Sequence, residues 1–116
     1  MKFVNLMVIT SAENEDAIKN IAKDCGADGA TVIQGRGSSS GTKKSFFSLT
    51  FEGNQTIVNY VLEEKLSKKV LRAINKMILD DELSCVAFTM PISHIVGLDR
   101  EVLRKFEDTI KKEDDL

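Results

Sequence analysis

The stretch of sequence that decides the fold is 63-EEKLSKKVLRAINKMIL-79. Its apolar residues recur four apart, at Leu66, Val70, Ile74 and Ile78. Lysines and one arginine occupy the other side. This spacing matches the 3.6-residue turn of a helix that buries one face. The stretch therefore predicts an amphipathic helix that packs on a core.

A strand and another helix are predicted at the start of the chain. Residues 3–9, FVNLMVI, are short and rich in apolar and β-branched side chains, which favours a buried central strand. Ser11 is placed to cap a following helix, and Gly26 is placed to end it. Between them, apolar residues recur at helical spacing, at Ala17, Ile18, Ile21, Ala22 and Cys25.

Three more extended runs separate the two helices, at residues 30–33, 45–51 and 56–62. They are enriched in residue types that strands favour. Gly35 ends the first run, and Gly53-Asn54 predicts a turn before the third. We therefore expect the second and third strands of a sheet here, with residues 56–62 as a further strand or the far arm of a hairpin.

A fourth strand is predicted after the second helix, at residues 84–90. Pro91 marks its end, because proline has no N–H to donate to a sheet ladder. Residues 92–96 are expected to extend along this edge up to Gly97. Residues 99–112 carry the apolar spacing of a short helix before an acidic tail.

The order of these elements is β-α-β-β-α-β. This is the split βαβ arrangement of an α+β, ferredoxin-like sandwich, here with an extra C-terminal helix. Both helices would cover one face of an antiparallel sheet, and the other face would expose Phe3, Phe47, Val58 and their neighbours. An apolar sheet face usually needs a partner, so the sequence predicts an oligomer.

The composition limits the classes of protein to which the chain can belong. Its 116 residues, 42% of them hydrophobic, support one domain with a single core. Lysine plus arginine (16) nearly balances aspartate plus glutamate (18), so there is no general positive field for a nucleic acid backbone. No apolar run approaches the roughly 20 residues that a membrane-spanning helix needs. We expect a cytoplasmic protein that binds no nucleic acid.

The segment between the second and third strands is 35-GRGSSSGTKK-44, which has no apolar side chain with which to pack. Its glycines could take positive φ and turn N–H groups onto an anion, while Arg36, Lys43 and Lys44 add positive charge. The segment thus predicts a site for a phosphate-like or carboxylate ligand, with a plain flexible connection as the alternative. It lacks the Gly-Lys-Ser/Thr of a P-loop and leads into a strand, which excludes a P-loop ATPase.

No set of residues predicts catalysis. The only histidine, His94, lies in the expected edge strand, where strand alternation accounts for it. Residues 80–82, Asp-Asp-Glu, follow a helix, where acidic runs are more often solvated turns than cation sites. Cys25 and Cys85 have no metal-like spacing. We therefore expect no enzyme, and a metal-binding or metal-tolerance trimer that uses these residues is the alternative hypothesis.

Several motifs, in their order along residues 1–98, resemble those of the nitrogen-regulatory P-II proteins and especially of their divergent P-II-like relatives. They are Gly26-x-x-Gly29-Ala30-Thr31-Val32, then Gly35-Arg36-Gly37 opening a loop, then Val86-Ala87-Phe88-Thr89-Met90-Pro91, and finally Ile95-Val96-Gly97-Leu98.

The resemblance implies a homotrimer of ferredoxin-like protomers whose sheets face inward, which would cover the apolar face. It implies a P-II-like domain at residues 1–98 and a C-terminal helix and acidic tail at residues 99–116. A T-loop at residues 36–44 would reach a protein target, such as a membrane transporter or an enzyme, in signal transduction and nitrogen regulation.

The resemblance also implies effector sites in clefts between subunits, for an adenine nucleotide or another small anion. By position, the ligand-binding residues would be Thr31, Gly35, Arg36, Gly37, Ser38, Ser39, Lys43 and Lys44. The partner-binding residues would be Ser40, Gly41 and Thr42.

Two departures from the P-II pattern argue against sensing of ATP and 2-oxoglutarate. The family's second loop is glycine-rich, ends in lysine and holds phosphate, whereas residues 79–84 here are LDDELS, with acids that would repel a triphosphate. The family's two phosphate-closing arginines are replaced by Gly97 and Asp99. A different anion is therefore expected, such as another adenine nucleotide, a cyclic dinucleotide or bicarbonate.

Overall fold

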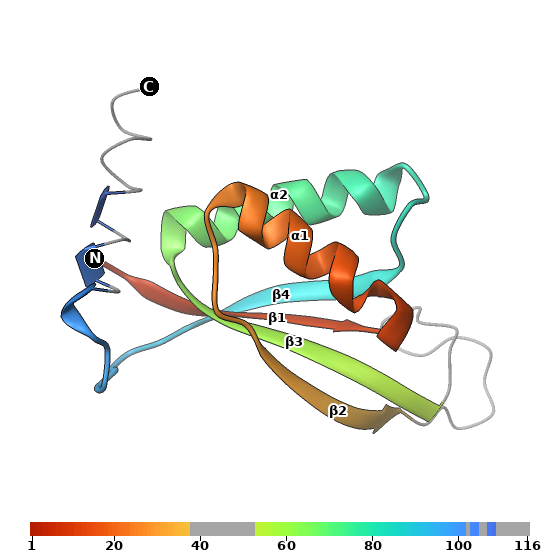
Figure 1. Cartoon of the computed structure of the whole chain (residues 1–116), viewed down its shortest axis with the longest axis horizontal. Helices are drawn as coiled ribbons and strands as arrows, with labels where there is room; N and C mark the ends of the chain where they lie inside the picture. Colours follow the sequence, from red (N-terminus) through yellow and green to blue (C-terminus); the bar gives the residue numbers. More distant parts are fainter. Residues whose placement is uncertain (38–52, 102, 105–106, 109–116) are drawn as a thin grey trace.

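The computed structural model describes residues 1–37, 53–101, 103–104 and 107–108. Its helices and strands follow the predicted order: β1 (Phe3–Thr10), η1 (Ala12–Asn14), α1 (Glu15–Cys25), β2 (Thr31–Gly37), β3 (Gly53–Glu63), α2 (Glu64–Leu79) and β4 (Cys85–Pro91). The helices α1 and α2 lie together on one face of a four-stranded sheet (Figure 1). The α+β, ferredoxin-like class is confirmed.

The strands lie in the order β2-β3-β1-β4, and each neighbouring pair is antiparallel. β1 is therefore parallel to β2 and separated from it by β3, which is the split βαβ arrangement. The two central strands pair along their whole common length, from Phe3 with Glu63 to Thr10 with Thr56. Pro91 is the last residue of β4, an edge strand, as expected for a residue without an N–H.

The hydrophobic core lies between the helices and the sheet. Along β1 the even-numbered residues are buried and the odd-numbered ones half-buried, because successive strand residues point to opposite faces. The predicted stripe of α2 closes the core, with Leu66, Val70 and Ile74 buried and Ile78 packed at its margin. From α1, Ile18 and Ala22 are fully buried against it.

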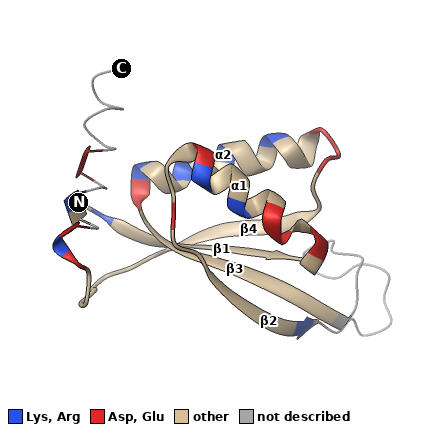
Figure 2. Cartoon of the chain, viewed as in Figure 1, with Lys and Arg blue, Asp and Glu red and all other residues tan. Residues whose placement is uncertain are grey.

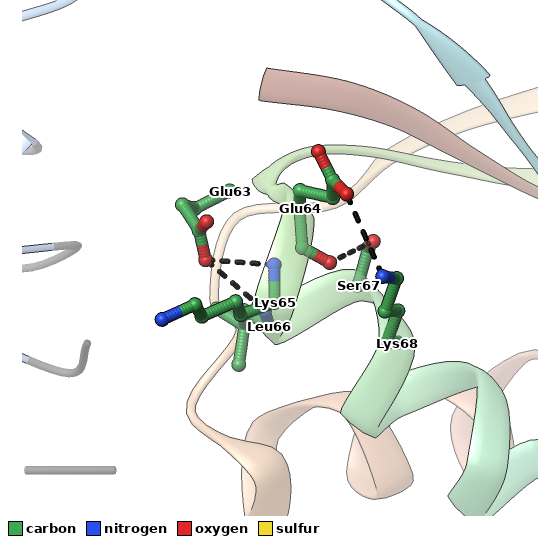
Figure 3. A network of polar contacts seen from close by, with 6 residues as sticks. All are labelled: Glu63, Glu64, Lys65, Leu66, Ser67 and Lys68. Carbon is green, nitrogen blue, oxygen red and sulfur yellow. Dashed lines mark hydrogen bonds and ion pairs between the residues drawn. The ribbon is translucent and has the colours of Figure 1, made fainter. Parts of the chain in front are cut away.

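A glutamate side chain caps the start of α2 (Figure 3). The Glu63 carboxylate accepts hydrogen bonds from the backbone N–H groups of Lys65 at 2.8 Å and Leu66 at 3.2 Å. In the same turn the Ser67 hydroxyl donates to the Glu64 carbonyl at 2.6 Å. The first N–H groups of a helix have no partner within it, so the carboxylate satisfies two of them and complements the positive end of the helix dipole. Glu63 is both the last residue of β3 and the cap of α2, so β3 passes directly into α2.

The two helices end in different ways. α1 ends at Gly26 as predicted, with a left-handed φ of 104° that glycine adopts without strain. After α2, Asp81 takes the left-handed position with a φ of 58°. The Asp81 N–H donates to the Ile78 carbonyl at 3.1 Å, and the Glu82 N–H donates to the Met77 carbonyl at 2.9 Å. These bonds form a Schellman cap in which an aspartate stands where glycine is usual.

Two predictions about chain path were wrong. Gly53 and Asn54 do not form a turn, because the β2–β3 ladder continues through them and pairs them with Gly37 and Arg36. Residues 92–96 do not extend β4 as a strand; the chain leaves the sheet after the Ile92 N–H donates to the Phe3 carbonyl at 3.2 Å.

Two side-chain predictions were also wrong. The Ser11 hydroxyl makes no capping hydrogen bond to the helix backbone and donates to the Glu13 carboxylate at 3.3 Å. Val58 is fully buried on the helix side of the sheet.

The expected strand at residues 45–51, with Phe47, lies outside the described residues. Of the expected C-terminal helix, residues 100–101, 103–104 and 107–108 are described and are helical.

Candidate functional site

The sheet face turned away from the helices, here called the open face, is largely apolar. Directly paired residues on neighbouring strands point to the same side, so the register defines its rows. The rows are Phe88-Met7-Asn59-Thr31, Val86-Ile9-Ile57-Ile33 and Met90-Asn5-Val61. Ile33, Val61 and Met90 are 47%, 36% and 40% exposed. The predicted uncovered apolar face is therefore present, although Val58 does not belong to it.

The residues predicted to bind a ligand are divided along β2. Thr31 begins the strand, and Gly35, Arg36 and Gly37 end it. A strand rises about 3.3 Å per residue, so Thr31 and Arg36 lie roughly 16 Å apart. Thr31 pairs with Asn59 on the open face, whereas Arg36 pairs with Asn54 on the helix side. One protomer does not bring these residues together.

The remaining predicted site residues lie outside the described part of the chain. They are Ser38, Ser39, Ser40, Gly41, Thr42, Lys43 and Lys44. Their ligand-binding and partner-binding roles stay predictions.

The glycines at the end of β2 do not form an anion-binding turn. Gly35 and Gly37 pair with Gln55 and Gly53 in the sheet, and neither has a positive φ. The prediction that these two glycines turn their N–H groups onto an anion was therefore wrong. A Cβ at Gly35 would lie 3.7 Å from Ile57 Cδ1, an ordinary contact, whereas a Cβ at Gly37 would collide with the Gln55 side chain.

Buried hydroxyl groups hold together the end of the sheet where β2 and β3 lead toward residues 38–52. Thr10 and Thr56 face each other across β1 and β3, and both are fully buried. The Thr10 hydroxyl donates to the Ser84 carbonyl at 2.8 Å, and the Thr56 hydroxyl donates to Gln34 Oε1 at 3.3 Å. The Asn14 amide donates to Thr10 Oγ1 at 3.0 Å. These bonds join β1, β2, β3 and the turn after α2.

Charge at this end of the sheet is mixed. Arg36, at the tip of β2, is the one cation of that strand (Figure 2). The turn between α2 and β4 lies at the same end and carries the exposed acids Asp80, Asp81 and Glu82. It is a solvated turn, as predicted. β2 and β4 are the opposite edges of the sheet, so three strand spacings, about 14 Å, separate Arg36 from the strand that follows this turn.

A pocket of about 270 Å³ lies at the other end of β2. It is lined by α1, the connection to β2, and β3, through Lys19, Asn20, Lys23, Ala27, Asp28, Gly29, Ala30 and Tyr60. The Gly29 N–H donates to the Asp28 carboxylate at 2.9 Å. Burial, and secondarily the Asp28 charge, raise the pKa of the Tyr60 hydroxyl, which therefore stays protonated at neutral pH.

Sequence reasoning missed this pocket. The sequence feature that could have indicated this pocket is the pair Lys19 and Lys23. These lysines lie one helical turn apart on α1, just ahead of the Gly29-Ala30-Thr31 motif. Tyr60 gave no signal, because its burial on the helix side follows from the register of β3.

The residues of the metal hypothesis are not gathered in the described part of the chain. No group of three or more His, Cys, Asp or Glu residues that could hold a metal ion occurs among those residues. His94 is exposed in the irregular segment after β4, which corrects its placement on an edge strand. Cys25 and Cys85 are both reduced thiols, and burial raises the pKa of Cys85 to about 11. The structure gives this hypothesis no support.

The fold and the open face agree with one family. A model of the family described as nitrogen regulatory protein P-II matches residues 2–101. The chain belongs to the P-II family. This confirms the resemblance seen in the sequence, and the family is one of regulatory proteins. No curated protein is significantly similar in sequence, and no helix in the described residues is long and apolar enough to cross a membrane.

Solved structures share the P-II fold at low sequence identity. CPII, a nitrogen regulatory PII-like protein from Thiomonas intermedia K12 bound to ADP, AMP and bicarbonate, is 14% identical with a TM-score of 0.62, over 84% of this chain and 98% of that one. The same protein bound to ADP, AMP and acetate is 18% identical with a TM-score of 0.61, over 90% and 94%. A PII-like signalling protein from Thermus thermophilus is 16% identical with a TM-score of 0.61, over 79% and 88%.

Proposed function

We propose that this P-II chain is a cytoplasmic signalling protein that binds a small anionic effector in clefts between copies of the chain. The effector class that we favour is an adenine nucleotide with fewer charges than ATP. The T-loop at residues 36–44 would then change its contacts with a protein target, a membrane transporter or an enzyme. Family membership supports the regulatory role, and the nucleotides and small anions named for CPII support the effector class.

The observation that carries this proposal is the division of the ligand residues along β2. Thr31 and Arg36 lie roughly 16 Å apart in one protomer and on opposite sides of the sheet. An effector that contacts both must therefore take Thr31 from one copy and Arg36 from another. The apolar open face supplies a surface on which copies would associate, as a trimer.

Two groups of charged residues favour a weakly charged effector. Residues 79–84 stand in the place of the family's phosphate-holding loop, and their acids, Asp80, Asp81 and Glu82, would repel each added phosphate there. At the Thr31 end, Lys19 and Lys23 line the pocket together with Asp28 and the Tyr60 hydroxyl, so both donors and acceptors are available. ADP, AMP and bicarbonate fit this balance better than ATP does.

A thermal-shift series at fixed salt tests the effector class. We expect ADP, AMP or bicarbonate to raise the melting temperature of the parent by several degrees, and to do so more than ATP, because a ligand that binds the folded state stabilises it. The triple variant Arg36→Ala, Lys43→Ala, Lys44→Ala should lose this shift. If no compound shifts the parent, or if the triple variant responds equally, the proposed effector site is wrong.

A mixed-copy experiment tests whether the site lies between copies. Thr31→Glu and Arg36→Ala should each lose effector binding when assembled alone, since every cleft then has one defective side. Co-assembly of the two variants would create some clefts with both sides intact, so part of the binding should return. A mixture that binds no better than either variant alone would place the site within one protomer.

A further inference from the structure

Two asparagines interrupt the apolar open face. Asn5 lies on β1 between Met90 and Val61, and Asn59 lies on β3 between Met7 and Thr31. Because Asn5 pairs with Val61, two residues from Asn59, the two amides are diagonal neighbours across the central strand pair. The Oδ1 atom of each is buried, and neither has a hydrogen-bond partner in the described structure.

These positions are unfavourable for asparagine in a single protomer. Asparagine is depleted in strands, and both residues sit in the central strands β1 and β3. Buried polar atoms normally have partners, and leaving one unpaired costs stability. On the helix side of the same strands, Val4 and Leu6 flank Asn5, and Val58 precedes Asn59. Apolar residues of these types would pack the open face without this cost.

A second copy of the chain is the partner that fits the two amides. An amide carries both an acceptor oxygen and an NH2 donor, so the same side chain on another copy can supply what this one lacks. Near the axis of a symmetric ring each side chain meets the same side chain of the other copies, and farther out it meets a different patch of its neighbour. The χ2 torsion of asparagine is broad, so each amide can turn toward a donor across an interface. A heterologous partner would have to supply its own matching polar pair.

We propose that Asn5 and Asn59 form the polar contact between copies on the open face, with amides of neighbouring copies hydrogen-bonding to one another. The apolar residues around them supply most of the attraction, and the amides fix which arrangement of copies satisfies every buried polar atom. A single buried asparagine fixes register and oligomeric state in coiled coils by the same physics. This inference rests on the assembly proposed above.

The first test replaces the amides with apolar side chains of similar shape. We expect the parent to show one oligomeric species by sedimentation velocity and native mass spectrometry. The double variant Asn5→Leu, Asn59→Leu should still associate but as a mixture of oligomers, because no polar contact then selects one arrangement. Asn75→Leu is the matched control, since Asn75 is exposed on α2 and should leave the single species unchanged.

The outcomes separate this inference from the proposed assembly. A monomeric parent at tens of micromolar would remove both. A single parent oligomer with an unchanged double variant would remove the role of the amides and leave the assembly standing. If the double variant aggregates, an aspartate variant that keeps the size and polarity of the side chain tests the role of the amides instead.

Asn59→Asp makes the contact depend on pH. At pH 7.5 carboxylates from several copies would meet at the interface and repel one another, so the assembly should dissociate. Near pH 4.5, protonated carboxyls can donate and accept like an amide, so it should re-form. The parent and Asn75→Asp should behave alike at both pH values. An Asn59→Asp oligomer as stable at pH 7.5 as the parent would contradict the proposal.

Discussion

The hydroxyl of Thr10 donates a hydrogen bond to the backbone carbonyl of Ser84 at 2.8 Å and so ties the end of β1 to the turn that follows α2. Thr10 is fully buried, and Asn14 reaches both groups, donating to Thr10 Oγ1 and to the Ser84 carbonyl. The acidic turn is therefore held at the end of the sheet where Arg36 lies.

Thr10→Val should remove this tie while keeping the shape of the side chain. We expect the free energy of unfolding to fall by about 1–2 kcal/mol, because a buried hydrogen bond is lost and Asn14 loses an acceptor. Urea unfolding measures the loss, and amide hydrogen exchange at residues 82–84 should accelerate. Thr89→Val, at an exposed threonine of β4, is the control and should change stability little. Equal effects of the two substitutions would argue against the tie.

Asp81→Gly should stabilise the protein. Asp81 holds a φ of 58°, where a residue with a Cβ is strained and glycine is not. The expected gain in the free energy of unfolding is about 1 kcal/mol. Asp80→Gly is the control, because Asp80 has a φ of −85° and gains nothing from glycine. A loss of stability in Asp81→Gly would show that the carboxylate itself stabilises the turn.

Glu63→Ala should destabilise the start of α2. The substitution leaves the N–H groups of Lys65 and Leu66 without their acceptor, which costs about 1 kcal/mol for a helix cap. Glu63→Gln keeps an acceptor oxygen and removes the charge, so its loss should be smaller. Chemical unfolding of the three proteins measures the difference. Equal losses for alanine and glutamine would assign the effect to charge rather than to the hydrogen bonds.

The fold could be predicted because the sequence patterns agree with one another. The four-residue spacing in α2, the apolar run in β1 and the stop at Gly26 each specify a local structure that the others can pack against. The β2–β3 pairing at Gly53 and Asn54 was missed because local turn propensity competes there with a ladder, and the ladder prevails through contacts distant in sequence.

The candidate site was predicted less completely, for a geometric reason. Thr31 and Arg36 are close in sequence, but an extended strand holds them far apart and on opposite sides of the sheet. The unpaired oxygens of Asn5 and Asn59 also depend on the register between β1 and β3, which sequence periodicity does not specify. Both features appear only once the strands are paired.

Cys85 should make stability depend on alkaline pH. Burial raises the pKa of its thiol from 9.0 to about 11, so between these values the unfolded chain loses a proton that the folded chain keeps. The free energy of unfolding is therefore not reduced by this thiol below pH 9, and it falls as pH rises from 9 toward 11. Cys85→Ala will lower stability at all pH values through lost packing, but it should flatten the slope between pH 8.5 and 10. An unchanged slope would contradict the raised pKa.

Gly35→Ala separates a glycine needed by the fold from one needed by a ligand. Gly35 lies in extended backbone, and an added Cβ would meet Ile57 Cδ1 at 3.7 Å, so the fold should tolerate alanine and gain up to about 0.5 kcal/mol from the unfolded state. If the effector approaches the Gly35 backbone from another copy, its affinity for ADP should fall at least about tenfold, measured by calorimetry. Gly37→Ala, which must displace the Gln55 side chain, controls for disturbance of the same strand end. A Gly35→Ala variant that folds and binds ADP like the parent would mean that no ligand contacts the Gly35 backbone. The proposed cleft would then include Thr31 and Arg36 but not Gly35.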